Sequence, residues 1–187
     1  MRTTTLLLVL LTLSCGASAA NSITIGKKVY FEAYREENKD GSLREYVQPS
    51  ESLDTWTTLI GVRIFNKLTS PKEYILNMAA EYKRRFPLNQ FAIFENHKTG
   101  GWIVDYIIFP SDLTEGVIEW NFFEAVPNKS GGGILVNQFA ARRTVVNSLR
   151  ETMKEWNFKE YRTSMFPLLV ESGFPIKEEE SGRRKTP

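Results

Sequence analysis

Apolar and polar residues alternate in the first part of the chain, and a period of two is typical of a half-buried strand. Ile23, Ile25, Val29, Phe31 and Ala33 all occupy odd positions. We therefore expect one strand over 23–33 with these five side chains on its buried face.

A second strand follows a turn. The segment 38–41 reads Asn-Lys-Asp-Gly, which is turn chemistry, and alternation resumes over 43–47 before Pro49. This pattern predicts a hairpin at a sheet edge. The segment 56–65 is rich in β-branched and aromatic residues, which favours a third strand.

The segment 70–86 predicts a helix. Ser70 is a good N-cap, Pro71 fits the first turn, and Glu73 completes a capping box. Apolar residues then recur at the spacing of one helix face, and Pro87 ends the segment. These residues are Ile75, Met78, Ala79, Tyr82 and Phe86.

The remaining part of the chain predicts four strands and a second helix. The strands are expected over 90–95, 102–109, 117–126 and 133–141, the helix over 144–161 and an irregular apolar segment over 166–174. Short turns between strands favour antiparallel pairing. The sequence thus predicts an α+β fold, a single twisted antiparallel sheet of six to seven strands with two amphipathic helices on its apolar face.

The N-terminus has the order of a secretory signal peptide. Met1-Arg2 is followed by an apolar run over 6–13 and by the small residues 17–19, so we expect cleavage after Ala19. The run is too short to span a membrane, which takes about 20 residues, and no other run is longer. The expected organisation is a signal peptide over 1–19, a single domain over 20–175 and a charged, disordered tail over 176–187.

An alternative for export is a lipid anchor. Cys15 is the only cysteine, and it is followed by Gly16, as in bacterial lipoproteins. In either case the mature chain has no disulfide, and we expect a location in the periplasm, outside the cell or anchored in the envelope.

Composition excludes several classes of function. The formal net charge of +2 argues against a nucleic-acid binder, which is usually far more basic. His97 is the only histidine, so a zinc site with two or more histidines cannot form, and its turn-like surroundings indicate a solvent-facing residue. Gly131-Gly132-Gly133 follow Lys129 and precede a strand, which is the wrong order for a phosphate loop. We expect no cofactor and no metal.

Carboxylates are the remaining acid–base groups. Asp105 interrupts the apolar strand 102–109, so it must be paired or hydrogen-bonded. Together with Glu119 or Glu124 on the next strand, it predicts the carboxylate pair of a hydrolase acting on envelope polysaccharide. The alternative is a structural ion pair between Asp105 and an arginine of the sheet. The arginines considered are Arg63, Arg142 and Arg143.

The four tryptophans leave a further alternative open. They either fill the core or line a cavity that carries an apolar ligand. These residues are Trp56, Trp102, Trp120 and Trp156.

Segment 45–60, which reads EYVQPSESLDTWTTLI, resembles a segment of small exported bacterial proteins of unknown function. The order of the predicted elements is similar to the PsbP/Mog1-like arrangement, an antiparallel sheet flanked by helices. This resemblance implies an accessory or binding protein and supplies no catalytic residue.

The leading hypothesis is therefore a non-enzymatic, exported protein that binds a protein partner. Arg142, Arg143 and Glu124 are near expected strand ends, and we expect them to form the binding surface. The carboxylate hydrolase and the carrier of an apolar ligand remain the alternatives.

Overall fold

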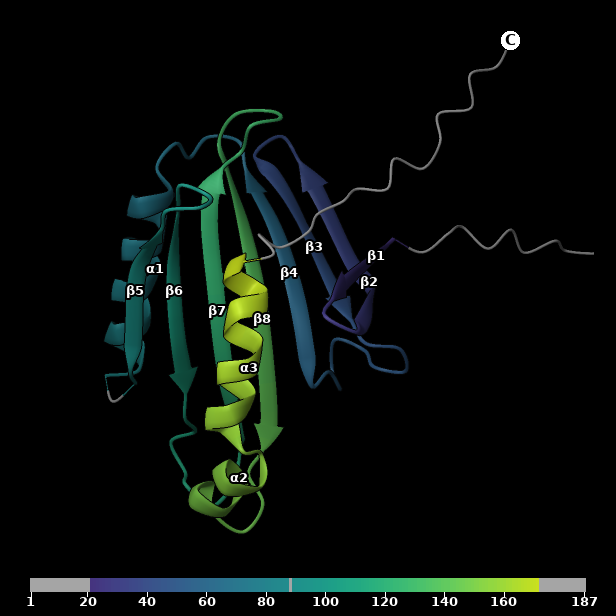
Figure 1. The fold of residues 1–187 in the computed structure, drawn as a ribbon, viewed down its shortest axis with the longest axis vertical. Coiled ribbons are helices and arrows are strands. Elements are labelled where there is room, and N and C mark those ends of the chain that lie inside the picture. Colours follow the sequence, from purple (N-terminus) through teal and green to yellow (C-terminus); the bar gives the residue numbers. More distant parts are fainter. Residues whose placement is uncertain (1–20, 88, 172–187) are drawn as a thin grey trace, which may run out of the picture.

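The computed structural model describes residues 21–87 and 89–171, whose eight strands form one antiparallel sheet (Figure 1). This confirms the predicted α+β class, with eight strands and three helices among the described residues. The elements are β1 (Ser22–Ile25), β2 (Lys28–Asn38), β3 (Gly41–Val47), β4 (Thr58–Phe65), α1 (Pro71–Arg85), β5 (Phe91–Asn96), β6 (Gly101–Ile108), β7 (Val117–Pro127), β8 (Ile134–Thr144), α2 (Leu149–Glu155) and α3 (Phe158–Glu171).

The sheet consists of two four-strand halves joined at the centre. The strand order is β1-β2-β3-β4-β8-β7-β6-β5, so β8, the last strand among the described residues, lies between β4 and β7. Thr58 of β4 pairs with Ala141 of β8, and Phe65 pairs with Ile134.

The first predicted strand is in fact a hairpin. Gly26 has φ +59° and begins a two-residue turn, so that Ile25 pairs with Lys28. Because paired residues share a face of the sheet, this turn exchanges odd and even positions. Ile23 and Ile25 share a buried face with Tyr30, whereas Val29 and Phe31 are on the other face and are 39% and 40% exposed. The prediction of one common buried face was wrong.

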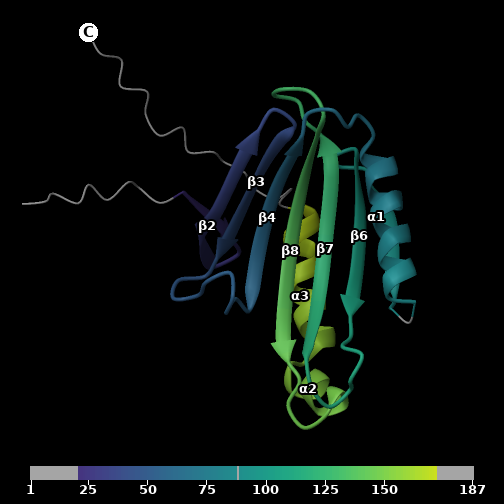
Figure 2. The ribbon, with the colours of Figure 1, turned by 180° about the vertical axis from the view of Figure 1, so that it is seen from behind.

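The helices cover opposite faces of the sheet, which corrects the expectation that both lie on one face. On the α1 face, Ile75 and Ala79 of the helix pack against Val104 and Phe123. On the α3 face, Leu169 belongs to a core formed by residues from both halves of the sheet. Figure 2 shows α1 beside β6 and α3 behind the strands, with no described helix in front of β2, β3 and β4.

The first helix agrees with its prediction. It runs from Pro71 to Arg85, and the Ser70 side chain accepts a hydrogen bond from the Glu73 backbone N–H at 3.2 Å. This cap satisfies an amide that has no partner inside the helix.

The second helix, predicted over 144–161, begins later and ends later in the structure, where α2 starts at Leu149 and α3 ends at Glu171. Strand β8 continues to Thr144, and the helical segment is divided at Asn157, whose φ of +49° interrupts helical geometry. α3 then passes through Pro167 to Glu171, where an irregular segment was expected. The predicted apolar side is correct, because Val145, Leu149, Met153 and Trp156 all contribute to the core of the α3 face.

Three of the expectations fall outside the described residues. They are cleavage at Ala19, lipid attachment at Cys15 and the charged tail. Within 21–87 and 89–171, no helix has both the length and the apolar character needed to cross a membrane.

Candidate functional site

The residues singled out from the sequence are divided between the two faces of the sheet. By strand register and contacts, Glu119 and Arg142 are on the α1 face, whereas Asp105, Glu124 and Arg143 are on the α3 face. β7 and β8 are antiparallel, so Glu124 lies toward the opposite end of this strand pair from Arg142 and Arg143. The three expected binding residues do not form one surface.

Asp105 is a buried residue that joins α3 to the sheet. It is 5% exposed, and its carboxylate accepts a hydrogen bond from the Trp120 indole N–H at 2.5 Å. The Arg162 guanidinium of α3 donates two more, one of them from Nε at 3.0 Å. The structural ion pair therefore forms, but with an arginine of α3 rather than with Arg63, Arg142 or Arg143.

Glu124 is a buried carboxyl without a cationic partner among the described residues. It is 1% exposed, and its Oε1 accepts hydrogen bonds from Asn96 Nδ2 at 2.8 Å and from the Thr99 hydroxyl at 2.7 Å. Burial raises the pKa of the Glu124 carboxyl, and the hydrogen bonds from Thr99 and Asn96 oppose part of that rise.

The carboxylates are poorly placed for hydrolysis. Glu119 accepts a hydrogen bond from Asn121 Nδ2 at 2.7 Å on the face opposite to Asp105. Glu124 shares a face with Asp105 and is diagonal to it across β6 and β7. Both carboxylates are buried and hydrogen-bonded to protein groups. Catalysis would require a route for substrate to reach them.

Arg142 fastens a loop to the α1 face. Its guanidinium lies 4.1 Å from the centre of the Trp56 ring and donates hydrogen bonds to the backbone carbonyls of Trp56 at 2.5 Å and Asp54 at 2.6 Å. Leu53 and Trp56 of this loop pack over Val47. The contacts of Arg142 are thus directed inward, to its own chain.

Arg143 and His97 also have clear positions. The Arg143 guanidinium lies 5.1 Å from the centre of the Trp156 ring and donates to the Arg142 carbonyl. His97 is in the β5–β6 turn with 85% of its side chain exposed, as its sequence context indicates. Among the residues described, no group of three or more acidic, histidine or cysteine side chains could hold a metal ion.

The sequence did not reveal an apolar patch on the uncovered half of the α1 face. We define the open patch as Val29, Phe31, Tyr34 and Leu43. The first three are 39–40% exposed, and Leu43 is half-buried. The register places all four on the same face. Phe31 pairs with Val47, which is four residues from Leu43 on β3, so Phe31 and Leu43 share a face. Val29 is two residues before Phe31, and Tyr34 is two residues before Glu36, which pairs with Leu43. The signal that would have revealed the patch is the Gly26-Lys27 turn, which reverses the facing of β2.

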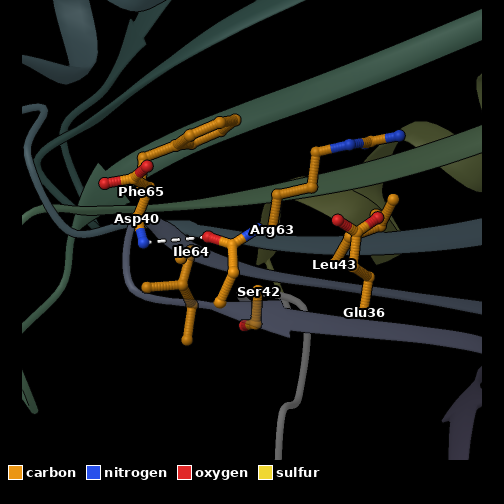
Figure 3. Close-up of a pocket in the computed structure, with 9 residues that line it drawn as sticks. Glu36, Asp40, Ser42, Leu43, Arg63, Ile64 and Phe65 are labelled. Carbon is orange, nitrogen blue, oxygen red and sulfur yellow. Dashed lines mark hydrogen bonds between the residues drawn. The ribbon is translucent and has the colours of Figure 1, made fainter.

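A shallow hollow of about 280 Å³ adjoins the open patch at the β2–β3 turn. In Figure 3, Phe65 and Arg63 point to one side of the strands, and Ile64 and Ser42 point to the other. Glu36 and Asp40 supply carboxylates at this hollow. Asp40 forms an ion pair with Lys67, and Glu36 accepts a hydrogen bond from the Tyr34 hydroxyl at 3.0 Å.

A row of polar side chains separates the hollow from the part of the face that α1 covers. Arg63 Nη2 lies 3.6 Å from Glu45 Oε1, and Arg63 Nη1 donates a hydrogen bond to Gln138 Oε1 at 2.7 Å. Gln138 in turn donates to Asn121 Oδ1 at 2.9 Å, and Asn121 donates to Glu119. The row crosses β3, β4, β8 and β7, so these polar groups are held by one another and present a rigid margin beside the open patch.

Comparison with protein families matches residues 17–166 to one family model, and the chain belongs to that family. No curated protein and no solved structure gives a significant match.

Proposed function

We propose that this family member is a non-enzymatic binding or accessory protein that is exported and recognises a protein partner through the open patch. The observation that carries the proposal is the exposure of three large apolar side chains on β2, on the half of the α1 face that no described helix covers (Figure 2). Contiguous exposed apolar surface with a polar rim is typical of interaction sites.

The rim suggests the chemistry of the partner. The carboxylates of Glu36 and Asp40 border the hollow, and Asp40 is paired with Lys67. The guanidinium of Arg63 is engaged by Glu45 and Gln138, so Glu36 supplies the acidic group offered to a partner. A partner with an apolar side chain for Phe31 and Tyr34, flanked by a lysine or arginine, would complement both features.

Rigidity of the surface also favours recognition. The polar row fixes one margin, and the clamp of Arg142 on the 48–57 loop fixes another. A pre-organised surface loses less conformational entropy on binding. Export is supported by the signal-like order of residues 1–19, and the family match begins at residue 17, after the apolar run.

The positions of the carboxylates favour binding over hydrolysis. Asp105 and Glu124 are buried and hydrogen-bonded to protein groups, and neither lines the hollow beside the open patch. Hydrolysis of an envelope glycan by the purified protein, abolished by Asp105→Asn, would restore the rival hypothesis.

A photo-crosslinking residue placed at Phe31 or Tyr34 tests the proposal in the native host. We expect one protein to be captured at these positions and then to form a stoichiometric complex with the purified chain. Phe31→Ser and Glu36→Lys should weaken that complex at least tenfold. Val146, which is 56% exposed outside the open patch, supplies the control, and Val146→Ser should leave binding unchanged. Equal capture at position 146, or unchanged binding by Phe31→Ser, would rule out the open patch as the binding surface.

A further inference from the structure

We propose that Glu124 is held as a neutral carboxylic acid and acts as a proton-controlled latch that fastens the β5–β6 turn and the last turn of α3 to the sheet. The latch consists of Glu124, Asn96, Thr99, Asn137 and the backbone carbonyl of Val170. This inference does not depend on the proposed binding function.

Two neutral donors from one turn meet the same oxygen of Glu124. Asn96 Nδ2 and the Thr99 hydroxyl both donate to Oε1, and Asn96 is itself only 4% exposed. Asn96 Nδ2 also lies 3.4 Å from the carbonyl of Val170 in α3. The amide of Asn96 thus links the carboxyl of Glu124 to the end of the helix.

An unused acceptor lies on the other side of Glu124. Asn137 of β8 is directly opposite Glu124 in the register, so their Cβ atoms are about 5 Å apart on the same face. Asn137 Oδ1 is buried and has no hydrogen-bond partner among the described residues. A protonated Glu124 can donate its O–H to this oxygen, whereas an ionised Glu124 has no proton to donate and would leave Asn137 Oδ1 unsatisfied.

The surroundings offer little to stabilise a negative charge. Ile103 is opposite Glu124 on β6, and the adjoining carboxylate on this face, Asp105, already engages Arg162 of α3. Of the charged side chains in the β5–β6 turn, His97 is largely exposed and lies beside Glu95, and Lys98 is exposed. Burial accordingly raises the pKa of Glu124.

The direction of the pH effect follows from this rise. As pH increases, an unfolded chain releases the proton of Glu124 before the folded protein does. The latch is therefore at full strength below the pKa of an unfolded glutamate, and its contribution to stability is lost as pH rises through the higher, folded pKa. Acidification fastens the end of α3, and alkalinisation loosens it.

Two measurements test the latch. The first follows the side-chain ¹³C carboxyl resonance of Glu124 in the wild-type protein during a pH titration. We expect a midpoint above that of the exposed glutamates, and a midpoint at their value would overturn the proposal.

The second measurement compares amide hydrogen exchange in the last turn of α3 between the wild type and Glu124→Gln, whose amide can replace the protonated acid. Above the folded pKa, wild-type exchange should accelerate relative to the variant by up to tenfold per pH unit. Glu119→Gln, a change on the same strand but the other face, should behave as the wild type. If the ratio of the wild-type exchange rate to that of Glu124→Gln stays constant across this pH range, the proposal is overturned.

Discussion

Arg162 of α3 donates two hydrogen bonds to the buried carboxylate of Asp105 on β6, and this pair connects the helix to the sheet. The carboxylate is 5% exposed and the arginine side chain 38%. Removing the arginine would leave a buried charge with the Trp120 indole as its remaining hydrogen-bond donor.

We therefore expect Arg162→Met to lower the free energy of unfolding by about 2 kcal/mol, since hydrogen bonds to charged groups contribute roughly 1.5–3 kcal/mol. The loss should be below that for a fully buried ion pair because solvent already screens Arg162. Urea denaturation measures the change. Arg150→Met, at an exposed position in α2, is the control, and an equal loss in both variants would contradict a specific role for Arg162.

The Thr99 hydroxyl supports the carboxyl of Glu124 and lowers its pKa. Thr99→Val keeps the shape of the side chain but removes this donor, so the pKa of Glu124 should rise further. We expect a stability loss of about 1 kcal/mol above the folded pKa of Glu124, where the carboxyl is ionised, and a smaller loss below it, where the carboxyl is protonated. Urea unfolding across this pH range measures the effect, and a loss that does not vary with pH would argue against it.

Pro167 lies at an exposed position inside α3. Because proline cannot donate to the carbonyl four residues earlier and its ring crowds that carbonyl, it costs up to about 3 kcal/mol in a helix interior. Pro167→Ala should therefore stabilise the protein by about 1–3 kcal/mol in a thermal unfolding experiment, with Lys159→Ala as a nearly neutral control. If Pro167→Ala destabilises the protein, α3 requires a kink to follow the sheet.

Arg142 holds the 48–57 loop through two backbone carbonyls and the ring of Trp56. Arg142→Ala should weaken this attachment by about 1–2 kcal/mol, which corresponds to roughly 5- to 30-fold faster hydrogen exchange in the loop. Arg143→Ala is the matched control, because Arg143 contacts Trp156 on the other face. Equal acceleration of loop exchange in both variants would disprove the clamp.

Gly41 closes the β2–β3 turn beside the hollow. Its φ is +155°, and a Cβ atom at this position would lie 1.8 Å from the carbonyl oxygen of Ile64 on β4. β3 and β4 would therefore have to separate. Gly41→Ala should lower stability by well over about 1 kcal/mol. Gly132→Ala has a positive φ but no atom within 4 Å of the new Cβ, and it should cost only the backbone strain, about 1–2 kcal/mol. Thermal unfolding of both variants separates the steric clash from the backbone strain. Equal losses of stability in the two variants would contradict the clash at Gly41.

Local signals predicted the elements whose determinants are close together in sequence. The cap at Ser70 and the apolar spacing from Ile75 onward identified α1 to within a residue at its start. The hairpin at Gly26 escaped detection, because odd positions remain apolar on both sides of the turn although the turn exchanges their faces. Pro167 suggested an irregular segment, yet packing of Phe166 and Leu169 against the sheet maintains a helix there.

The candidate site depended on tertiary pairing and was less predictable. The sequence indicated that Asp105 must have a partner, but Arg162 is 57 residues away and lies one residue beyond the predicted end of the second helix. Arg142 and Arg143 are neighbours in sequence, and strand geometry sends them to opposite faces. The open patch became visible only when the pairing of β1 with β2 was known.

The central place of β8 has a consequence for how the chain folds. Residues 134–144 form the last strand of the described residues to be synthesised, and β4 and β7 each lack a partner on one side until this strand pairs with them. Until then both halves present unpaired strand edges, which are prone to mispairing and aggregation. Folding should accordingly be slow compared with that of helical proteins of this size, and a chain truncated before residue 134 should remain dependent on chaperones.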